Sequence, residues 1–417
     1  MDRNKFAYFF RRSLLLLLLC SCQLRANQPA NVKSESEGMV EQNALTEDEQ
    51  TVITGDERTD VYFPILQDKR VAIFSNHTGM AGEEHILDLL IENHFQVTAI
   101  FSPEHGFRGD KDAGEKVSSS RDPQTGVPIH SLYEKGSNKP AQSSMETFDI
   151  LIVDIQDVGL RFYTYYITMC HLMEACAQYG KKMLILDRPN PNGHMVDGPI
   201  LDMKHKSGVG YLPVPVMHGM TLGELALMAN DKGWLENACH CQIEVVPCLG
   251  YTHRTMYRLS KAPSPNLPNM KAVYLYPSLC YFEATPLSVG RGTEFPFQVY
   301  GHPRLEGDFS FTPHSTAGAK NPPLKDQECT GRDLRSLSDE EIYSQGINLE
   351  YLIEAVRNLK GKTSETLLTS FFEKLIGVDY VRRMINEGAD AAQIKAMWKE
   401  DVERFKKDRK PYLLYEE

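Results

Sequence analysis

Ile150-Leu151-Ile152-Val153-Asp154-Ile155-Gln156-Asp157 joins a short apolar run directly to a polar cluster, and the chain repeats this pattern three more times. The other apolar runs are Val71–Phe74, Val97–Phe101 and Met183–Leu186, and polar residues follow them from Ser75, Ser102 and Asp187. Continuous apolar runs of this length are typical of strands buried on both faces, as in a parallel sheet. Ligands of open parallel sheets bind at the carboxyl ends of the strands, so the four clusters predict a polar cleft and an active site.

Helical patterns separate the apolar runs. Apolar residues recur at helical spacing over 83–94 and 163–179, and Gly180 is expected to end the second of these helices. Thr221 and Glu224 form a capping box that starts a third helix over 221–231. This alternation predicts an α/β fold with a Rossmann-like parallel sheet. No G-x-G-x-x-G follows the first strand, so a dinucleotide is not implied, and we expect no cofactor.

The pattern changes near residue 241. A strand is expected over 243–247, Pro-rich and Gly-rich loops follow, and helical spacing returns over 339–359, 364–376 and 391–407. We therefore predict a Rossmann-like domain over 58–240 and a second, smaller α+β auxiliary domain over 241–417, whose C-terminal part is helical.

Residues 1–22 have the organisation of a signal peptide. Basic residues precede the apolar run Leu14–Leu19, which is too short to remain as a membrane-spanning helix. Leu19-Cys20-Ser21-Cys22 resembles a lipobox in which Cys22 receives the lipid, and cleavage after Ala26 is the alternative. Residues 23–57 are polar and lack apolar periodicity, which is typical of a disordered tether. We predict an exported protein, either periplasmic or a membrane-anchored lipoprotein, that meets the membrane only through a lipid on Cys22.

Composition narrows the range of partners. The formal net charge of −11 argues against nucleic acid, which would require a basic surface. Seven cysteines follow the signal segment, so at least one is unpaired, and we interpret them mainly as small buried hydrophobic residues. The sequence specifies no oligomeric state.

Glu104 is the first candidate catalytic residue. It follows the second apolar run, in Ser102-Pro103-Glu104-His105-Gly106. A carboxylic acid that is partly desolvated at a cleft has a raised pKa and can act as a general acid. Capping of the next helix, or an ion pair with Arg108, is the alternative role. His105 is a candidate substrate-binding residue beside it.

A second group of candidates follows the third apolar run, and comprises Asp154, Gln156, Asp157 and Arg161. Strand geometry places Asp154 and Gln156 on one face. Arg161 would hold a carboxylate, while Tyr163 and Tyr165 would stack against a sugar ring. A local ion pair that orders the turn is the alternative.

The remaining candidates come from other segments. Asn76 and Asn190, in the turns after the first and fourth apolar runs, would complete the rim of the cleft. His218, which precedes the capped helix, is a further candidate for substrate binding, and a structural hydrogen bond is its alternative role. Glu283 and Arg291 flank a Gly-rich segment in which the backbone could approach a ligand closely.

Three kinds of chemistry are conceivable for this cleft: a metal site, a serine hydrolase and cleavage of a glycosidic bond. His77, Glu104, His105, Asp157 and His218 could in principle bind a metal, but no H-E-x-x-H or other compact ligand spacing supports a metal site. A serine hydrolase would need a G-x-S-x-G turn, which the chain lacks. Paired carboxylates in a polar cleft with aromatic residues fit cleavage of a glycosidic bond best.

Six motifs, in order, resemble those of one family. They are Ser102–Gly109, Asp154–Tyr165, Asp187–Pro191, His218–Thr221, Ser264–Pro268 and Ser288–Thr293. Together they are similar to the signatures of the NamZ-type exo-β-N-acetylmuramidases, formerly a family of unknown function, and the similarity covers about residues 60 to 305. Glu283-Ala284-Thr285-Pro286 departs from a more usual Glu-Gly-Thr-Asn run.

The resemblance implies a site between a Rossmann-like domain and an auxiliary domain, and release of terminal N-acetylmuramic acid from the non-reducing end of peptidoglycan fragments. It implies that Glu104 is the general acid and that Glu283 is the second acidic group. Arg161 or Arg291 would bind the lactyl carboxylate that distinguishes muramic acid from N-acetylglucosamine. A surface glycan-binding lipoprotein without catalysis and a metal-dependent amidase are the alternatives.

Overall fold

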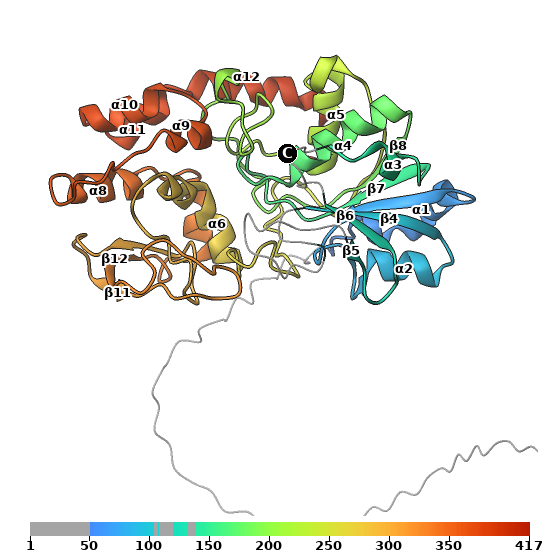
Figure 1. The fold of residues 1–417 in the computed structure, drawn as a ribbon. Helices are drawn as coiled ribbons and strands as arrows, with labels where there is room; N and C mark the ends of the chain where they lie inside the picture. The colour runs from blue at the N-terminus through green and yellow to red at the C-terminus, as the bar shows by residue number, and fades with distance from the viewer. Residues whose placement is uncertain (1–50, 104–106, 108–119, 132–138) are drawn as a thin grey trace, which may run out of the picture. The chain divides into compact units, whose positions relative to one another are not determined.

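A seven-stranded sheet is the main element of the computed structural model, which describes residues 51–103, 107, 120–131 and 139–417 (Figure 1). In spatial order its strands are β5 (Ser120–Arg121), β6 (Pro128–Ser131), β4 (Gln96–Ser102), β1 (Arg70–Ser75), β7 (Ile150–Asp154), β8 (Lys182–Leu186) and β9 (Gln242–Val246). All neighbours are parallel except β5, which pairs with β6 in the antiparallel sense. Counted along the chain, the parallel strands follow the 3-2-1-4-5-6 order of Rossmann folds, so the predicted α/β class is confirmed.

Helices cover both faces of this sheet. Side chains alternate along a strand, so Val71 and Ile73 of β1 face α1 (Thr59–Leu66) and α2 (Ile86–Glu92). Ala72 and Phe74 face the opposite side, with α4 (Tyr165–Tyr179) and α5 (Leu222–Asp231). Burial on both faces explains why the strands are continuously apolar in sequence. A short helix, α3 (Gln142–Met145), precedes β7.

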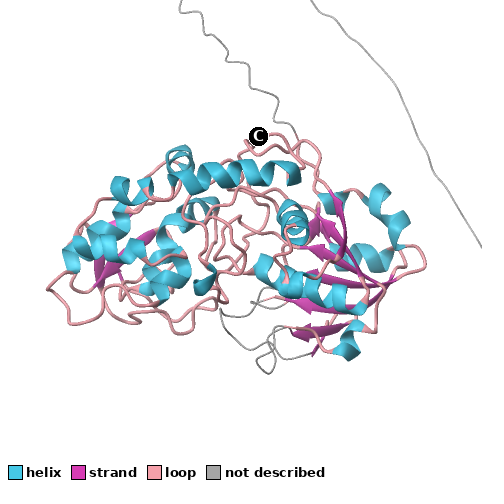
Figure 2. Cartoon of the chain, turned by 90° about the horizontal axis from the view of Figure 1, so that it is seen from above, coloured by secondary structure: helices cyan, strands magenta, loops and turns pink. Residues whose placement is uncertain are grey.

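The second part of the chain contains a small antiparallel sheet and most of the remaining helices (Figure 2). The strands β10 (Val299–His302), β11 (Phe309–Phe311) and β12 (Cys329–Asp333) lie in the order β10-β12-β11. The helices are α6 (Met270–Leu279), α7 (Asp339–Gln345), α8 (Glu350–Leu359), α9 (Phe371–Ile376), α10 (Tyr380–Glu387), α11 (Ala391–Ala396) and α12 (Lys399–Arg409). This composition agrees with the predicted α+β auxiliary part.

Four predicted helices are shorter than the sequence pattern indicated or are divided. The stretch 364–376 is helical only over α9, and the stretch 391–407 divides into α11 and α12. A hairpin of β2 (Met80–Ala81) and β3 (Glu84–His85) occupies the start of the stretch predicted as a helix over 83–94. His85 then caps α2, because its Nδ1 accepts a hydrogen bond from the backbone N–H of Leu87 at 3.1 Å. The stretch over 339–359 divides into α7 and α8 at Gly346, whose φ of 63° ends a helix.

The predicted domain boundaries also need correction at two points. Strand β9 lies beyond residue 240 yet pairs with β8, so the Rossmann-like sheet extends to residue 246. Residues 51–57, assigned to the tether, belong to the compact unit that runs from Gln50 to the C-terminus. Ile53 forms a β-bridge with Leu249, and the backbone N–H of Gly55 donates to the carbonyl of Asp187 at 2.9 Å. Backbone pairing therefore fixes a segment that has no apolar periodicity.

In the described ranges, no helix has both the length and the apolarity needed to cross a membrane.

Candidate active site

The carboxyl ends of β1 and β7 form the switch point of the sheet, where Rossmann-like folds bind their ligands. Asn76 follows β1 and is buried. Its Nδ2 donates to the hydroxyl of Tyr165 at 3.0 Å, and its Oδ1 accepts from the backbone N–H of Thr78 at 2.9 Å. Asn76 therefore positions the ring of Tyr165, the first residue of α4.

Asp154, at the end of β7, is part of an internal ion cluster. Its Oδ1 accepts from Nε of Arg188 at 2.6 Å, and Nη2 of Arg188 binds Asp56, with all three residues buried. Burial raises the pKa of Asp154, while Arg188 opposes this shift. The predicted binding role of Asp154 is not supported, because its carboxylate is buried and paired with Arg188. The cluster instead attaches Asp56, in the segment before α1, to the end of β7.

Gln156 and Asn190 bond to backbone within the loops after β7 and β8. Nε2 of Gln156 donates to the carbonyls of Asp157 and Pro189, both at 2.8 Å. Nδ2 of Asn190 donates to the carbonyl of Met220 at 2.9 Å. Both side chains are buried, and these hydrogen bonds shape the loops. The substrate-binding role of Gln156 and Asn190 stays a prediction.

Asp157 is a buried carboxyl group beside these loops. Its Oδ1 accepts from the backbone N–H of Gly159 at 2.7 Å. Desolvation raises the pKa of Asp157 to about 7, although backbone hydrogen bonds oppose this shift. It lines a cavity of about 10 Å³, which is room for one water molecule, and its role in binding a sugar stays a prediction.

The prediction that Arg161 binds a substrate carboxylate is wrong. Its guanidinium is fully buried and donates to four backbone carbonyls, those of Pro199, Val214, Leu375 and Ile376, at 2.7 to 3.1 Å. Burial lowers the pKa of Arg161 to about 10. The residue joins the loops after β8 to the end of α9, because the core at this point offers unpaired carbonyls and no carboxylate.

His218 is likewise structural. It is buried, and its Nδ1 accepts from the backbone N–H of Met220 at 3.2 Å. Burial lowers the pKa of His218 to about 3, with the nearby Arg409 and Arg161 acting in the same direction. The imidazole is neutral and enclosed, so its predicted contact with substrate is not supported.

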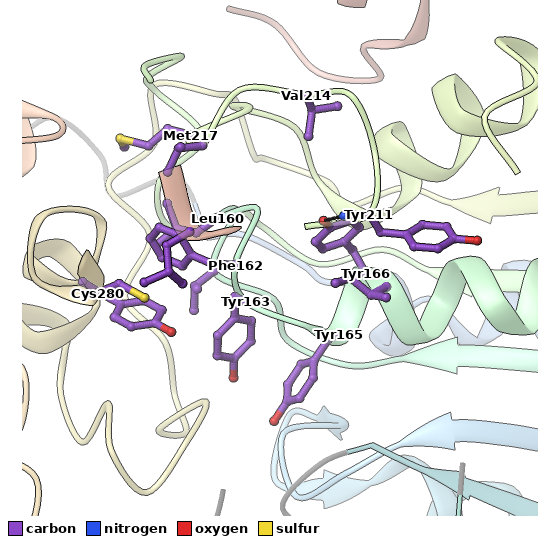
Figure 3. Close-up of a cluster of buried hydrophobic side chains, with 14 of the residues drawn as sticks. Leu160, Phe162, Tyr163, Tyr165, Tyr166, Tyr211, Val214, Met217 and Cys280 are labelled. Carbon is purple, nitrogen blue, oxygen red and sulfur yellow. Dashed lines mark hydrogen bonds between the residues drawn. The ribbon is translucent and has the colours of Figure 1, made fainter. Parts of the chain in front are cut away.

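Tyr163 and Tyr165 form one wall of a cavity that also bears an acidic and a basic side chain. Their rings meet edge to face with centroids 4.6 Å apart, and both hydroxyls donate to the carbonyl of Pro263, at 2.8 and 3.2 Å. Figure 3 shows the two rings directed to the same side, away from the neighbouring Phe162 and Leu160. The cavity has a volume of about 400 Å³, which suits a monosaccharide unit. Its lining comprises Phe162, Tyr163, Thr164, Tyr165, Val209, Ser264, Asn266, Leu267, Tyr276, Glu283, Arg291, Phe297 and Phe371.

Glu283 and Arg291 form the charged wall of the same cavity. Nε and Nη2 of Arg291 both donate to Oε1 of Glu283, at 2.9 and 2.6 Å, and the guanidinium lies 5.0 Å from the ring centroid of Phe297. The neighbouring Glu283 raises the pKa of Arg291 against the effect of burial. Nη1 of Arg291 makes no contact of this kind with Glu283, so the arginine retains donors for a ligand. The structure thus brings Tyr165, Glu283 and Arg291 together, as predicted.

Other lining residues were not predicted individually. Tyr276, Phe297 and Phe371 come from a helix, a loop and a further helix that are distant in sequence. Their apolar spacing resembles ordinary core packing, and only the folded structure places them around one cavity.

Glu104 and His105 lie outside the described residues. The last described residue before them, Pro103, directly follows β4, which pairs with β1. Among the residues that the structure describes, no group of three or more His, Cys, Asp or Glu side chains is placed to hold a metal ion.

Aromatic walls stack against the C–H faces of sugar rings, and acidic and basic side chains bond to sugar substituents. A Rossmann-like sheet with such a cavity fits the glycoside hydrolase class that the sequence predicts.

Comparison with known proteins identifies the family. The model of the N-terminal domain of exo-β-N-acetylmuramidase NamZ matches residues 71–271, and the model of its C-terminal domain matches residues 274–415. The chain is 35% identical over 369 residues to the peptidoglycan β-N-acetylmuramidase NamZ of Bacillus subtilis, covering 84% of this chain and 88% of that protein. The chain therefore belongs to the NamZ exo-β-N-acetylmuramidase family.

Two solved structures of DUF1343 family proteins from Bacteroides fragilis share the fold. One is 62% identical, with a TM-score of 0.82 over 88% of this chain and 99% of that chain. The other is 25% identical, with a TM-score of 0.77 over 88% of this chain and all of that chain.

Proposed function

We propose that this protein is an exo-β-N-acetylmuramidase that releases terminal N-acetylmuramic acid from the non-reducing end of peptidoglycan fragments. The observation that carries the proposal is the cavity that faces Tyr163 and Tyr165 on one side and the Glu283–Arg291 pair on the other. Family membership supports the reaction, and the cavity supports the class of substrate, because muramic acid combines a sugar ring with a carboxylate.

Arg291 is proposed to bind the lactyl carboxylate. Of the two arginines considered, Arg161 is saturated by backbone carbonyls, whereas Arg291 lines the cavity and keeps Nη1 for a ligand. Glu283 and Phe297 hold the guanidinium in one plane, which favours the paired hydrogen bonds that a carboxylate accepts.

Substrate preference tests this assignment. For Arg291→Ala we expect kcat/KM on N-acetylmuramic acid glycosides to fall about 100-fold, because a charge-assisted contact is lost. The small activity on the matching N-acetylglucosamine glycoside, which lacks the lactyl group, should change little. Arg335→Ala, which removes an arginine paired with Asp333 outside the cavity lining, is the matched control. An equal loss on both substrates would remove Arg291 from carboxylate recognition.

Glu104 is proposed as the general acid that protonates the leaving oxygen. Its support is that it follows β4 by two residues in the sequence, that β4 pairs with β1 at the switch point of the sheet, and that it occurs in the family motif. For Glu104→Gln we expect kcat on a natural disaccharide to fall by about 10³, the contribution of a positioned acid.

Two leaving groups separate this role from a structural one. A nitrophenyl glycoside has a leaving group that needs little protonation, so Glu104→Gln should lose much less activity on it than on the disaccharide. Equal losses on the two substrates would show that Glu104 is not the acid. Saturable sugar binding by the wild-type protein without any turnover would overturn the enzymatic proposal itself.

Export and lipidation are proposed from the N-terminal sequence. The support is the basic start, the apolar run Leu14–Leu19 and the lipobox-like Leu19–Cys22. A lipid on Cys22 followed by a polar tether would hold the enzyme at a membrane in the periplasm, within reach of cell-wall fragments. The mass of the mature N-terminal peptide tests this proposal: a diacylated Cys22 is expected, and Cys22→Ser should shift the protein to the soluble fraction. A mature chain that starts at Asn27 would contradict lipidation.

A further inference from the structure

The end of α4 and the start of β9 bring two cysteines together. Cys176 lies in the last turn of α4, where its carbonyl accepts from the backbone N–H of Lys181 at 2.8 Å. The next residue, Lys182, is the register partner of Gln242 in the parallel pair of β8 and β9. Cys241 immediately precedes Gln242, so its backbone stands beside Lys181 and therefore beside the end of α4.

Both thiols face the same interior. Cys176 and Cys241 are each 0% exposed and belong to one hydrophobic cluster between α4, α5 and the sheet. The pKa of Cys176 is raised above its ordinary value, first by the interaction with the neighbouring thiol of Cys241 and then by burial.

Backbone contacts fix the position of Cys241. The side chain of Asn230, on α5, accepts from the N–H of Cys241 at 2.9 Å and donates to its carbonyl at 3.0 Å. The hydrogen bond from Lys181 fixes Cys176 in the same way from the other side. The approach of the two thiols thus depends on regular structure and not on a loop.

We propose that Cys176 and Cys241 form a disulfide bond when the chain folds outside the cytoplasm. Each thiol gives up its proton, the two sulfurs together give up two electrons, and a dithiol–disulfide carrier of that compartment accepts both by opening its own S–S bond to two thiols. The inference rests on the proposed export and is independent of the proposed catalytic site.

The bond forms before the fold closes. In the folded structure solvent reaches neither sulfur, and thiols with raised pKa values are poor nucleophiles. Oxidation therefore requires a stage of folding at which α4 has not yet packed against β9. Once formed, the bond closes the loop from 176 to 241 and raises stability by restricting the unfolded chain.

Refolding of the full chain tests this proposal without reference to location or activity. The protein is unfolded in guanidinium chloride, refolded either with a mixture of reduced and oxidised glutathione or with reductant alone, alkylated, and mapped by mass spectrometry without reduction. We expect the peptides of Cys176 and Cys241 to be joined, with the mass of two hydrogen atoms missing, only after oxidative refolding. The oxidised protein should melt about 5–10 °C higher than the reduced protein.

Cys239 supplies the control, because it is half-buried and lies two residues from Cys241. Cys239→Ala should leave the joined peptides intact, whereas Cys176→Ala or Cys241→Ala should abolish them. Recovery of both Cys176 and Cys241 as free thiols after oxidative refolding of the wild-type chain would overturn the proposal. A bond from Cys239 to either cysteine would also overturn it. Both outcomes are read from the wild-type chain, so they do not depend on whether a variant folds.

Discussion

Arg161 is a charged side chain in the core that pairs with no carboxylate of the described residues, and four backbone carbonyls accept hydrogen bonds from its guanidinium. For Arg161→Leu we expect the free energy of unfolding to fall by about 3–5 kcal/mol, because buried carbonyls lose their donors. Urea denaturation measures this change. Arg404→Leu is the control: Arg404 is exposed, pairs only with Asp401 one turn away, and should change stability by no more than about 0.5 kcal/mol. Similar losses in the two variants would contradict the structural role of Arg161.

Asp157 makes stability depend on pH. Burial raises the pKa of Asp157 to about 7, against about 3.9 in an unfolded chain, so between these values the folded state holds the proton more firmly. Its contribution is therefore complete below about pH 4 and is lost as the pH rises to about 7, by up to about 4 kcal/mol. Asp157→Asn keeps an acceptor for Gly159 and does not titrate. Unfolding free energies measured from pH 4 to pH 8 should fall less steeply in the variant, and parallel curves would contradict this account.

At the level of single residues, the sequence predicted side-chain chemistry better than side-chain environment. Glu283, Arg291 and Tyr165 were assigned to the site and line the cavity. Asp154 and Arg161 carry the same kinds of charged group, yet the fold encloses them. Enclosure depends on segments far away in the chain, such as Asp56 for Asp154, and no local pattern carries that information.

Gly180 ends α4 in the left-handed conformation, with φ of 62°, as the sequence predicted. For Gly180→Ala we expect a loss of about 1 kcal/mol in the free energy of unfolding, because an added Cβ meets open space and only the backbone conformation is penalised. Gly208→Ala provides the comparison, since its Cβ also meets open space and its φ is not left-handed. Chemical denaturation should show no loss for Gly208→Ala. Equal effects at the two positions would refute the conformational explanation.

At the level of elements, the long regular segments were predictable and the short ones were not. The apolar runs of β1, β4, β7 and β8 and the capping box of α5 correspond to observed elements, because each signal is local. The two-residue strands of the β2–β3 hairpin and the Gly-containing strands β10 and β12 carry no alternating pattern, and pairing with their neighbours creates them. The sheet order was accessible because parallel strands joined by helices have few permitted arrangements.

At the scale of the whole molecule, the last residues of the chain are bound to the Rossmann-like sheet. The hydroxyl of Tyr415 donates to Oδ2 of Asp187 at 2.6 Å, the backbone N–H of Leu414 donates to Oε1 of Glu224 at 2.8 Å, and the carbonyl of Glu416 accepts from the N–H of His253 at 2.8 Å. The tail therefore covers polar groups at the carboxyl end of β8.

Removal of residues 414–417 should therefore destabilise the Rossmann-like sheet. We expect the melting temperature to fall by about 4–8 °C, because Asp187 and Glu224 each lose a buried donor at a cost of about 1–3 kcal/mol. Tyr415→Phe, which keeps the ring packed on Tyr251, should show a smaller part of this decrease. A truncated protein with the same melting temperature as the wild type would show that the tail does not stabilise the sheet.

Asp187 gives this contact a further meaning, because its carbonyl also accepts the N–H of Gly55. The first described residues and the last ones thus meet at one amino acid, and Asp187 joins the two ends of the folded body. The chain must be synthesised as far as residue 415 before both contacts of Asp187 can form, so a shorter nascent chain lacks this junction. A force on the chain before Gly55 would therefore load the same junction that holds the C-terminal residues.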